Sequence, residues 1–456
     1  MESRCLARSS GSIAEGAAAS RDSLKRPQIQ VEAPRCLAVS KPRANAAAIG
    51  RESLTSERTI LLWMCLLVGV NQLGFGAMVP SLPLYAGSFG VSASAIGVAV
   101  AAYGLARFVA VLPGGQLADR WGRRPVLAIG GLLSAIGSFW CAGAHSFVEF
   151  NLARIVAGAG AGIILTIGQI VLADISSPNR RGRNIATYQA AFLFGFGVGP
   201  FPGGLLASAH GLAAPFLMTG VASLLATAIA WFLVSETRSA RRGAVPTDKA
   251  AEIPFARQML RLLSHRGFLL VSLISLMHAV VRTGGLFALI PLLATTTLGL
   301  SVAEIGFAMM VSGVCGLVAA YPGGWLADRL GRKAVIVPST VLTGMSMVLF
   351  CYAPSYAWFI VASIVWSVAT SISSSAPAAY VADTAPAGMN ASAMTAFRMT
   401  ADAGYVLGPP GLGLLADVTS STIAIISASV VLVSIGAIFA VTSPEKRSFA
   451  QPWAER

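Results

Sequence analysis

Apolar runs of about 20 residues recur along this sequence and restrict its fold more than any other feature. A helix of that length crosses the roughly 30 Å of hydrocarbon in a bilayer. Because the strands of a membrane barrel are short segments of alternating polarity, solid apolar runs exclude a barrel. The sequence predicts an all-α membrane protein with twelve transmembrane helices, at residues 59–80, 94–116, 125–145, 147–173, 184–207, 212–234, 267–293, 302–323, 334–354, 357–381, 391–415 and 421–442.

Charged residues are too few for a soluble protein and gather between the apolar runs. Only 11% of the 456 residues are charged, whereas a soluble globular chain has about a quarter. A net charge of +14 would suit a nucleic-acid partner. The Lys and Arg residues lie in short clusters rather than on one face, so nucleic acid is excluded as a partner. The chain is expected to be an integral membrane protein in contact with lipid.

The basic clusters alternate from loop to loop, which predicts the orientation in the membrane. Lys and Arg occupy the loops near 120–124, 180–183, 238–266 and 329–333, and the loop after the tenth run is an exception without any. The alternate loops contain neither residue type, at 81–93, 143–148, 208–211, 294–301, 352–356 and 416–420. By the positive-inside rule, the basic loops and both termini are cytoplasmic. We expect a multi-pass protein of the plasma (cell inner) membrane of a bacterium.

Residues 1–57 form a region of their own, rich in Ser, Ala, Arg and Pro. No apolar segment of a secretory signal is present, and six acidic residues argue against a transit peptide. Two interpretations remain open: a disordered, basic cytoplasmic tail, or a protein whose start lies further along the chain.

The membrane region consists of two halves that repeat each other. The stretches PGGQLADRWGRRPV at 113–126 and PGGWLADRLGRKAV at 322–335 share ten of fourteen residues at an offset of 209 positions. The same offset relates Asp174 to Asp383, Gly195 to Gly404, Gly199–Pro200 to Gly408–Pro409, Gly204 to Gly413, and Glu236 to Glu445. A half repeated in one orientation is typical of transporters with a parallel pseudo-twofold axis. We therefore predict six-helix bundles at 58–235 and 267–443, a cytoplasmic linker at 236–266 and a cytoplasmic tail at 444–456.

The repeated stretch carries a charge pattern that suits a contact able to close and open. Its glycines permit close backbone approach and a sharp chain reversal. A carboxylate such as Asp119 is stabilised near a helix N-terminus, whose first N–H groups lack partners. Arginines beside it can reach an acid at another helix end. A cluster that only sets the membrane orientation is the alternative. The predicted latch comprises Gly115, Asp119, Arg120, Gly122, Arg123, Arg124, Asp174, Gly324, Asp328, Arg329, Gly331, Arg332, Lys333 and Asp383.

This pattern, G-x-L-A-D-R-x-G-R-[RK] at 115–124 and 324–333, resembles the signature loop of the major facilitator superfamily, and the resemblance covers all twelve helices. It implies two six-helix bundles that rock about a central cavity between inward- and outward-open states. It implies that Asp119 contacts the N-terminus of the eleventh helix. It also implies that Arg123 pairs with an acid at the end of the fourth helix, which here is Asp174.

The fifth run contains G-x3-G-P-x2-G-G, formed by Gly195, Gly199, Pro200, Gly203 and Gly204. Small residues let helices approach closely, and proline removes a backbone donor and bends the helix. The pattern resembles the antiporter motif of drug:proton exporters, except that Ala186 stands where a further glycine belongs. General helix packing is the alternative. The fourth run holds Arg154 in R-x3-G-x-G, which resembles the second motif of the same family.

Polar and aromatic side chains inside the runs are candidates for coupling or cargo contact, because charge in the bilayer is costly and usually functional. Asp402 is the one acid placed near the middle of a run, as a proton carrier, as a cargo contact, or as an ion-pair partner of Arg398. His278 shares a helix face with Arg282 and is a titrating group or a hydrogen-bonded structural one. Aromatic residues at helical spacing also serve for packing alone. The candidates are Asn71, Gln72, Tyr103, Arg107, Arg154, Tyr188, Gln189, Phe192, His278, Arg282, Trp366, Arg398, Asp402 and Tyr405.

Together these patterns predict a secondary active transporter that functions as a monomer and exports a small organic or drug-like molecule in exchange for protons. Four arginines against one acid in the runs favour an alternative, an organic anion as cargo. A non-transporting membrane receptor is a remote alternative. No nucleophile–base set, metal-ligand spacing or phosphate loop is found, so neither an enzyme, a cofactor nor a metal site is expected.

Overall fold

The computed structural model describes residues 43–177, 180–237, 262, 264–385 and 389–443. The predicted tail up to residue 42, most of the linker and the C-terminal tail lie outside them. All helices from Ser53 onward belong to one compact unit. Helix α1 (Arg43–Met78) begins at Arg43, within the region 1–57 that the sequence set apart. Alanines at 44 and 46–48 favour helix and extend the first membrane helix.

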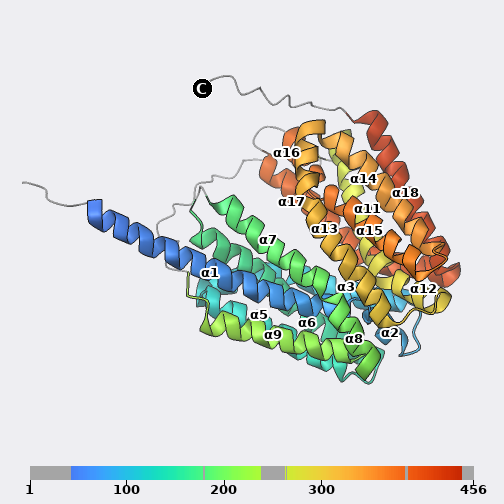
Figure 1. Cartoon of the computed structure of the whole chain (residues 1–456), viewed down its shortest axis with the longest axis horizontal. Coiled ribbons are helices and arrows are strands. Elements are labelled where there is room, and N and C mark those ends of the chain that lie inside the picture. Colours follow the sequence, from blue (N-terminus) through green and yellow to red (C-terminus); the bar gives the residue numbers. More distant parts are fainter. Residues whose placement is uncertain (1–42, 178–179, 238–261, 263, 386–388, 444–456) are drawn as a thin grey trace, which may run out of the picture. The chain divides into compact units, whose positions relative to one another are not determined.

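Helices make up both halves, and the described residues contain no strand. The first half contains α1, α2 (Leu82–Gly87), α3 (Ala93–Val109), α4 (Val111–Trp121), α5 (Arg123–Ala142), α6 (Phe147–Ile175), α7 (Arg181–Val198), α8 (Pro200–His210) and α9 (Ala214–Phe232). The second contains α11 (Arg266–Val280), the π-helix η2 (Val281–Leu289), α12 (Ile290–Thr297), α13 (Val302–Leu330), α14 (Arg332–Cys351), α15 (Tyr356–Ile372), α16 (Ala376–Thr384), α17 (Asn390–Val418) and α18 (Ser421–Thr442). In Figure 1 the blue-to-green helices gather on one side and the yellow-to-red helices on the other.

Eleven helical stretches of the described chain are long and apolar enough to cross a membrane. They coincide with eleven of the predicted runs. The remaining run is α17, whose 29 residues include Arg398, Asp402 and Asp417 and two internal prolines. Large apolar side chains such as Leu62, Leu112 and Val318 are exposed on these helices, as expected where lipid takes the place of water.

Two of the spans are divided into two helices near a proline. Each proline leaves one backbone carbonyl of the preceding turn without a hydrogen-bond donor. Pro113 cannot donate to Val109, where α3 ends and α4 follows. Pro200 cannot donate to Phe196, and α7 and α8 meet at Gly199. Gly199 itself keeps helical dihedral angles, φ −52° and ψ −40°, and the bend expected at Pro200 stays a prediction.

Close contacts between the two halves obey the repeat. A Cβ on Gly204 would meet the carbonyl of Val302, and one on Gly413 would meet the carbonyl of Ala93. The offset of 209 positions relates Gly204 to Gly413 and Ala93 to Val302, so the two contacts are equivalent under the repeat. The same shift relates the contact of Gly306 with Pro200 to that of Gly97 with Pro409. These contacts lie at the end of the helices where α3 and α13 begin, here called the opposite end. The end that carries Asp119 and Asp328 is called the loop end.

Candidate functional site

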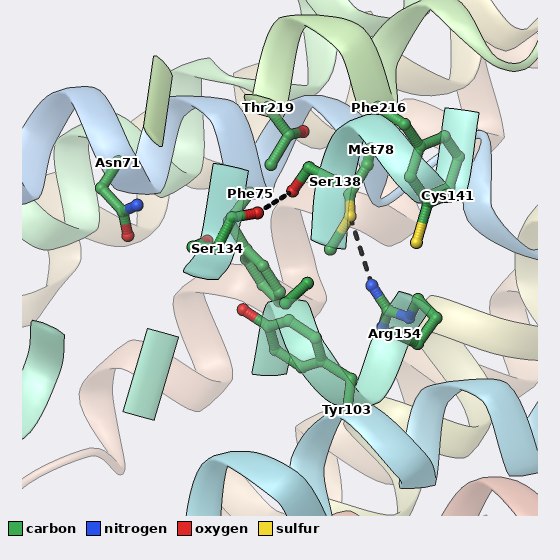
Figure 2. A pocket seen from close by; sticks show the side chains of 11 residues that line it. Asn71, Phe75, Met78, Tyr103, Ser134, Ser138, Cys141, Arg154, Phe216 and Thr219 are labelled. Carbon is green, nitrogen blue, oxygen red and sulfur yellow. Dashed lines mark hydrogen bonds between the residues drawn. The ribbon is translucent and has the colours of Figure 1, made fainter. Parts of the chain in front are cut away.

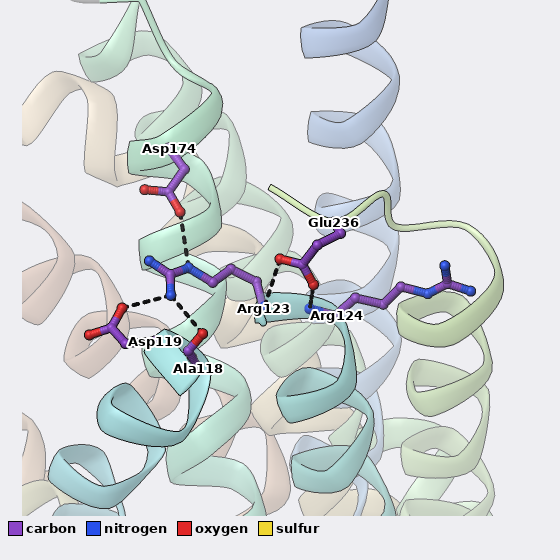
Figure 3. Close-up of polar contacts among 6 residues, drawn as sticks. All are labelled: Ala118, Asp119, Arg123, Arg124, Asp174 and Glu236. Atoms are coloured by element: carbon purple, nitrogen blue, oxygen red, sulfur yellow. Dashed lines mark hydrogen bonds and ion pairs between the residues drawn. The ribbon is translucent and has the colours of Figure 1, made fainter. Parts of the chain in front are cut away.

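Arg123 ties three helices together at the loop end of the first half (Figure 3). Its Nε donates to Asp174 Oδ2 at 3.1 Å, and its Nη1 donates to Asp119 Oδ1 at 2.7 Å and to the Ala118 carbonyl at 2.8 Å. The side chains of Arg123 and Asp174 are only 2% and 3% exposed. The predicted pairing of Arg123 with Asp174 is confirmed. A buried guanidinium with two carboxylates fixes the ends of α4, α5 and α6 against one another.

Glu236, which the sequence reasoning noted only as part of the repeat, is a further member of this cluster. Its Oε1 accepts from the backbone N–H of Arg123 at 2.9 Å and its Oε2 from that of Arg124 at 3.1 Å. These N–H groups open helix α5 and have no partner within the helix. Gly122 precedes them with φ 103°, and a Cβ there would meet the Glu236 carboxylate. The recurrence of Glu236 as Glu445 was the available signal, although Glu445 lies outside the described residues.

The second half contains an equivalent cluster that is more exposed to solvent. Arg332 Nη1 donates to Asp328 Oδ1 at 2.6 Å and to the Ala327 carbonyl at 2.7 Å, and its Nε donates to Asp383 Oδ2 at 3.4 Å. The side chain of Arg332 is 24% exposed and that of Asp383 is 47% exposed. Lys333 Nζ donates to the carbonyl of Ser443 at 2.8 Å. The repeat therefore extends to side-chain geometry.

The glycines of the predicted latch differ from the structure in two ways. Both motif helices continue through the acid to Trp121 and Leu330, so only Gly122 and Gly331 turn the chain. Close packing falls one residue before the predicted glycines, at Gly114 and Gly323, because those positions face the helix bundle. A Cβ on Gly115 would meet nothing within 4 Å, and one on Gly324 only a serine oxygen at 3.9 Å.

Asp119 also differs from the expectation that it contacts the eleventh helix. Its side chain is 68% exposed and its ion pair is with Arg123 of its own loop. Arg120 is exposed, and the other two loop arginines lie over tryptophan rings, Arg124 at 5.2 Å from Trp231 and Arg329 at 4.3 Å from Trp325.

The glycines of the fifth helix form one face against the first helix. Cβ atoms on Gly195, Gly199 and Gly203 would meet the carbonyls of Gly69, Leu73 and Ala77. The four-residue spacing thus follows α1 turn by turn. Gly204 lies one position beyond this face and contacts the second half instead. The motif therefore seals the first half internally and packs the halves together at the opposite end.

A cavity of about 430 Å³ is lined by both halves. His278, Arg282 and Trp366 are the sequence-predicted candidates that line it, together with Pro200 of the glycine motif. His278 Nε2 lies 3.3 Å from Thr340 Oγ1, so the histidine is both hydrogen-bonded and in the wall. Arg282 stands in the first turn of the π-helix η2, and such helices occur often at functional sites. The volume falls in the range of small-molecule sites.

A second, much smaller cavity of about 10 Å³ lies inside the first half (Figure 2). It has room for about one water. Asn71, Tyr103 and Arg154 line it. The Arg154 guanidinium lies 4.4 Å from the centre of the Tyr103 ring, and its Nε donates to the Ala99 carbonyl at 3.3 Å. This cluster is too closed to hold a cargo and fixes the fourth helix against the second.

Most of the remaining candidates do not meet at one site. Arg107 lies 5.2 Å from the centre of the Tyr405 ring, which joins α3 to α17. Asp402 is half-buried on α17 and interacts electrostatically with Arg282. No ion pair joins Asp402 to Arg398, which is exposed one turn away, so that alternative is not realised in the described chain. The other four candidates line neither cavity. Gln72 and Tyr188 are buried, Gln189 is exposed and Phe192 is half-buried.

Comparison with known proteins settles the family. Residues 64–301 and 272–455 each match the model of the Major Facilitator Superfamily. The chain belongs to the major facilitator superfamily. The recognition of this family from the two signature loops, with its resemblance to the drug:proton antiporter branch, is confirmed. The protein is therefore a multi-pass membrane transporter of that superfamily.

Two relatives indicate how far the similarity reaches. An uncharacterized MFS-type transporter of Methanocaldococcus jannaschii is 24% identical over 348 residues, which cover 76% of this chain and 89% of the relative. The quinolone resistance protein NorA of Staphylococcus aureus is 31% identical over 167 residues, or 36% of this chain and 42% of NorA.

Solved structures share the fold. The human organic anion transporter MFSD10 (TETRAN) has a TM-score of 0.58 and 17% identity, over 84% of this chain and 99% of that chain. The nucleoside transporter NupG has a TM-score of 0.68 and 16% identity, over 84% of this chain and 97% of that chain. At these identities the likeness concerns the fold alone.

Proposed function

We propose that this transporter works by alternating access and exports a small organic molecule across the plasma membrane in exchange for protons. The observation that carries the proposal is the cavity of about 430 Å³ shared by the two halves. Glycine contacts that obey the repeat close the bundle at the opposite end, where Gly204 meets Val302 and Gly413 meets Ala93. A binding cavity closed at one end is what one state of an alternating-access cycle requires.

The cavity extends from the middle of the spans toward the loop end. On α13, which begins at the opposite end, the lining residues are Met309 through Ala320. On α17, which begins at the loop end, they are Phe397 and Ala401. With the basic loops in the cytoplasm, this geometry corresponds to an inward-facing state. A cargo would enter from the cytoplasm, which agrees with export by a protein functioning as a monomer.

Asp402 is the proposed proton carrier. It is half-buried near the middle of α17, and no ion pair holds it in the described chain. Its electrostatic interaction with Arg282 links it to the cavity wall. A carboxyl group in this position can exchange a proton while the cargo is bound or released. The partial match to NorA, a quinolone resistance protein, favours a drug-like cargo.

Inside-out vesicles with a pH-sensitive dye test this function. Respiration acidifies the lumen, and a panel of lipophilic drugs and organic anions is added. We expect dye dequenching by at least one compound with the wild type and none with Asp402→Asn. Glu149→Gln is the matched control, because Glu149 in the first turn of α6 accepts from the backbone N–H of His145 at 3.0 Å, away from the cavity. Transport of labelled compounds without any dequenching by the wild type would refute proton exchange.

A further inference from the structure

We propose that the cargo is an organic anion, an apolar aromatic body that carries one carboxylate or a similar acidic group. This proposal rests on the proposed transport function and names the class of molecule that the same cavity takes. Its basis is the chemistry of the cavity wall, in which positive charge and free donors occur without a carboxylate.

The one charged side chain among the described lining residues is a cation, Arg282. His278 and Arg282, one turn apart on the seventh span, line the cavity. None of the lining residues in the described chain is Asp or Glu. Arg282 forms no hydrogen bond or ion pair with another described side chain, while Asp402 attracts it and Arg107 repels it. A guanidinium inside the membrane is costly without an anionic partner, and a bound carboxylate would supply one.

Two further donors of the wall have no partner. The indole Nε1 of Trp366 and the hydroxyl of Ser373 are buried without a hydrogen bond among the described residues. Both line the cavity. An indole N–H can only donate, and a buried donor left unpaired costs free energy that an acceptor atom of a ligand would recover. The indole N–H suits an anionic oxygen and offers nothing to an ammonium group, whereas the Ser373 hydroxyl can donate to the first or accept from the second.

The remainder of the wall is apolar and aromatic. Phe196 and Phe287, one from each half, lie with ring centroids 6.0 Å apart, and Leu286, Met309 and Phe397 complete this part of the wall. Such a surface suits a planar hydrophobic body. A lipophilic cation would find the same apolar contacts, but it would be repelled by Arg282. The wall therefore selects by charge rather than by hydrophobicity.

Three probes with one ring system separate these possibilities: 2-naphthoate, neutral 2-naphthamide and cationic 2-naphthylmethylammonium. Their binding to the purified full-length protein is measured by calorimetry. We expect naphthoate to bind the wild type at least tenfold more tightly than either other probe. Arg282→Gln should abolish this preference, and Arg282→Lys should keep part of it. Trp366→Phe should weaken naphthoate binding several-fold, because the ring remains and the donor is lost.

The control is Arg266→Gln, an exposed arginine at the loop end of the same span, which should keep the full preference. Equal binding of the three probes, survival of the preference in Arg282→Gln, or no binding at millimolar concentration would overturn the proposal. Failure of the transport function looks different. Arg282-dependent naphthoate binding without dye dequenching in vesicles would refute proton exchange and leave the cargo class standing. Dequenching by lipophilic cations alone would refute the anionic cargo and leave proton exchange standing.

Discussion

Asp417 closes the opposite end of the bundle by capping a helix that belongs to the other half. Its Oδ1 accepts from the backbone N–H of Ala93 at 2.8 Å and its Oδ2 from that of Ser94 at 3.1 Å. These groups open α3 and have no partner within the helix. The carboxylate sits at the last turn of α17, so this contact breaks when the halves part at the opposite end. We predict that Asp417→Asn shifts the protein toward the state that is open there.

The magnitude follows from the geometry. Loss of a cap costs roughly 0.5–2 kcal/mol, and a charge at a helix N-terminus contributes about 0.3–1 kcal/mol. Asp417 is exposed, so solvent screens it and the lower part of the combined range applies, about 1 kcal/mol. Because 1.4 kcal/mol corresponds to a factor of about ten, the ratio of the two states should change about fivefold.

The chain offers a matched control at the symmetry-related helix. The N-terminus of α13 is capped within its own half, where Glu304 Oε2 accepts from the Ser301 backbone N–H at 2.8 Å and the Ser301 hydroxyl accepts from the Glu304 N–H at 3.3 Å. Glu304→Gln removes a charge from an equivalent helix end, but the contact exists in both states. It should leave the ratio of states unchanged.

Spin labels on the exposed Ser88 and Thr419, in a variant without native cysteines, report the separation of the halves at the opposite end. Double electron–electron resonance should show a ratio of long-distance to short-distance population that is about five times higher in Asp417→Asn than in the unsubstituted, labelled protein. Equal distance distributions in Asp417→Asn and Glu304→Gln would refute the reasoning, because the cap would then not distinguish the two states.

Three further predictions test the packing and the loop clusters. Gly199→Val should lower the thermal stability by about 1–3 kcal/mol, because its Cβ meets backbone atoms of the first helix, whereas Gly182→Val faces open space and should be neutral in the same melting assay. Glu236→Gln should cost about 1 kcal/mol of stability through the lost cap on α5, and an unchanged melting temperature would contradict that role. Arg123→Lys should destabilise by about 3 kcal/mol and Arg332→Lys by clearly less, because the first arginine is 2% and the second 24% exposed, and equal losses in thermal unfolding would argue against burial as the cause.

Pairings within one half followed from the sequence where a repeated acid and a repeated arginine stand at helix ends. The ion pair of Arg123 with Asp174 was implied by the resemblance of the repeated loop to the major facilitator signature, and the hydrophobic pattern agrees with it because it places both residues at the same membrane boundary. The cap from Glu236 had a weaker signal, since only its recurrence after the last helix of each half pointed to it. Which of two adjacent glycines packs against a neighbouring helix could not be predicted in this way. Gly114 packs and Gly115 does not, because a rotation of 100° per residue decides which one meets Ile163.

Contacts between the halves escaped the sequence altogether. Nothing in the pattern around Asp417 connects it to Ala93, which lies 324 positions away. The cavity also could not be assigned from the sequence, because buried polar residues are distributed over many helices and only their rotation shows which of them meet. Of the fourteen candidates, the structure brings His278, Arg282 and Trp366 to the larger cavity and places Asn71, Tyr103 and Arg154 around the smaller one.

The sequence by itself determined the membrane-spanning helices, the twofold repeat and the charged clusters at the loop end. These features depend on local composition, since the bilayer requires about 20 apolar residues per span and leaves charges at its boundaries. The tertiary structure alone decided which side chains line the cavity and how the opposite end is closed. Both depend on how helices from different halves are rotated and packed. That arrangement is set by the shapes of many small side chains together, so no short stretch of the sequence contains it.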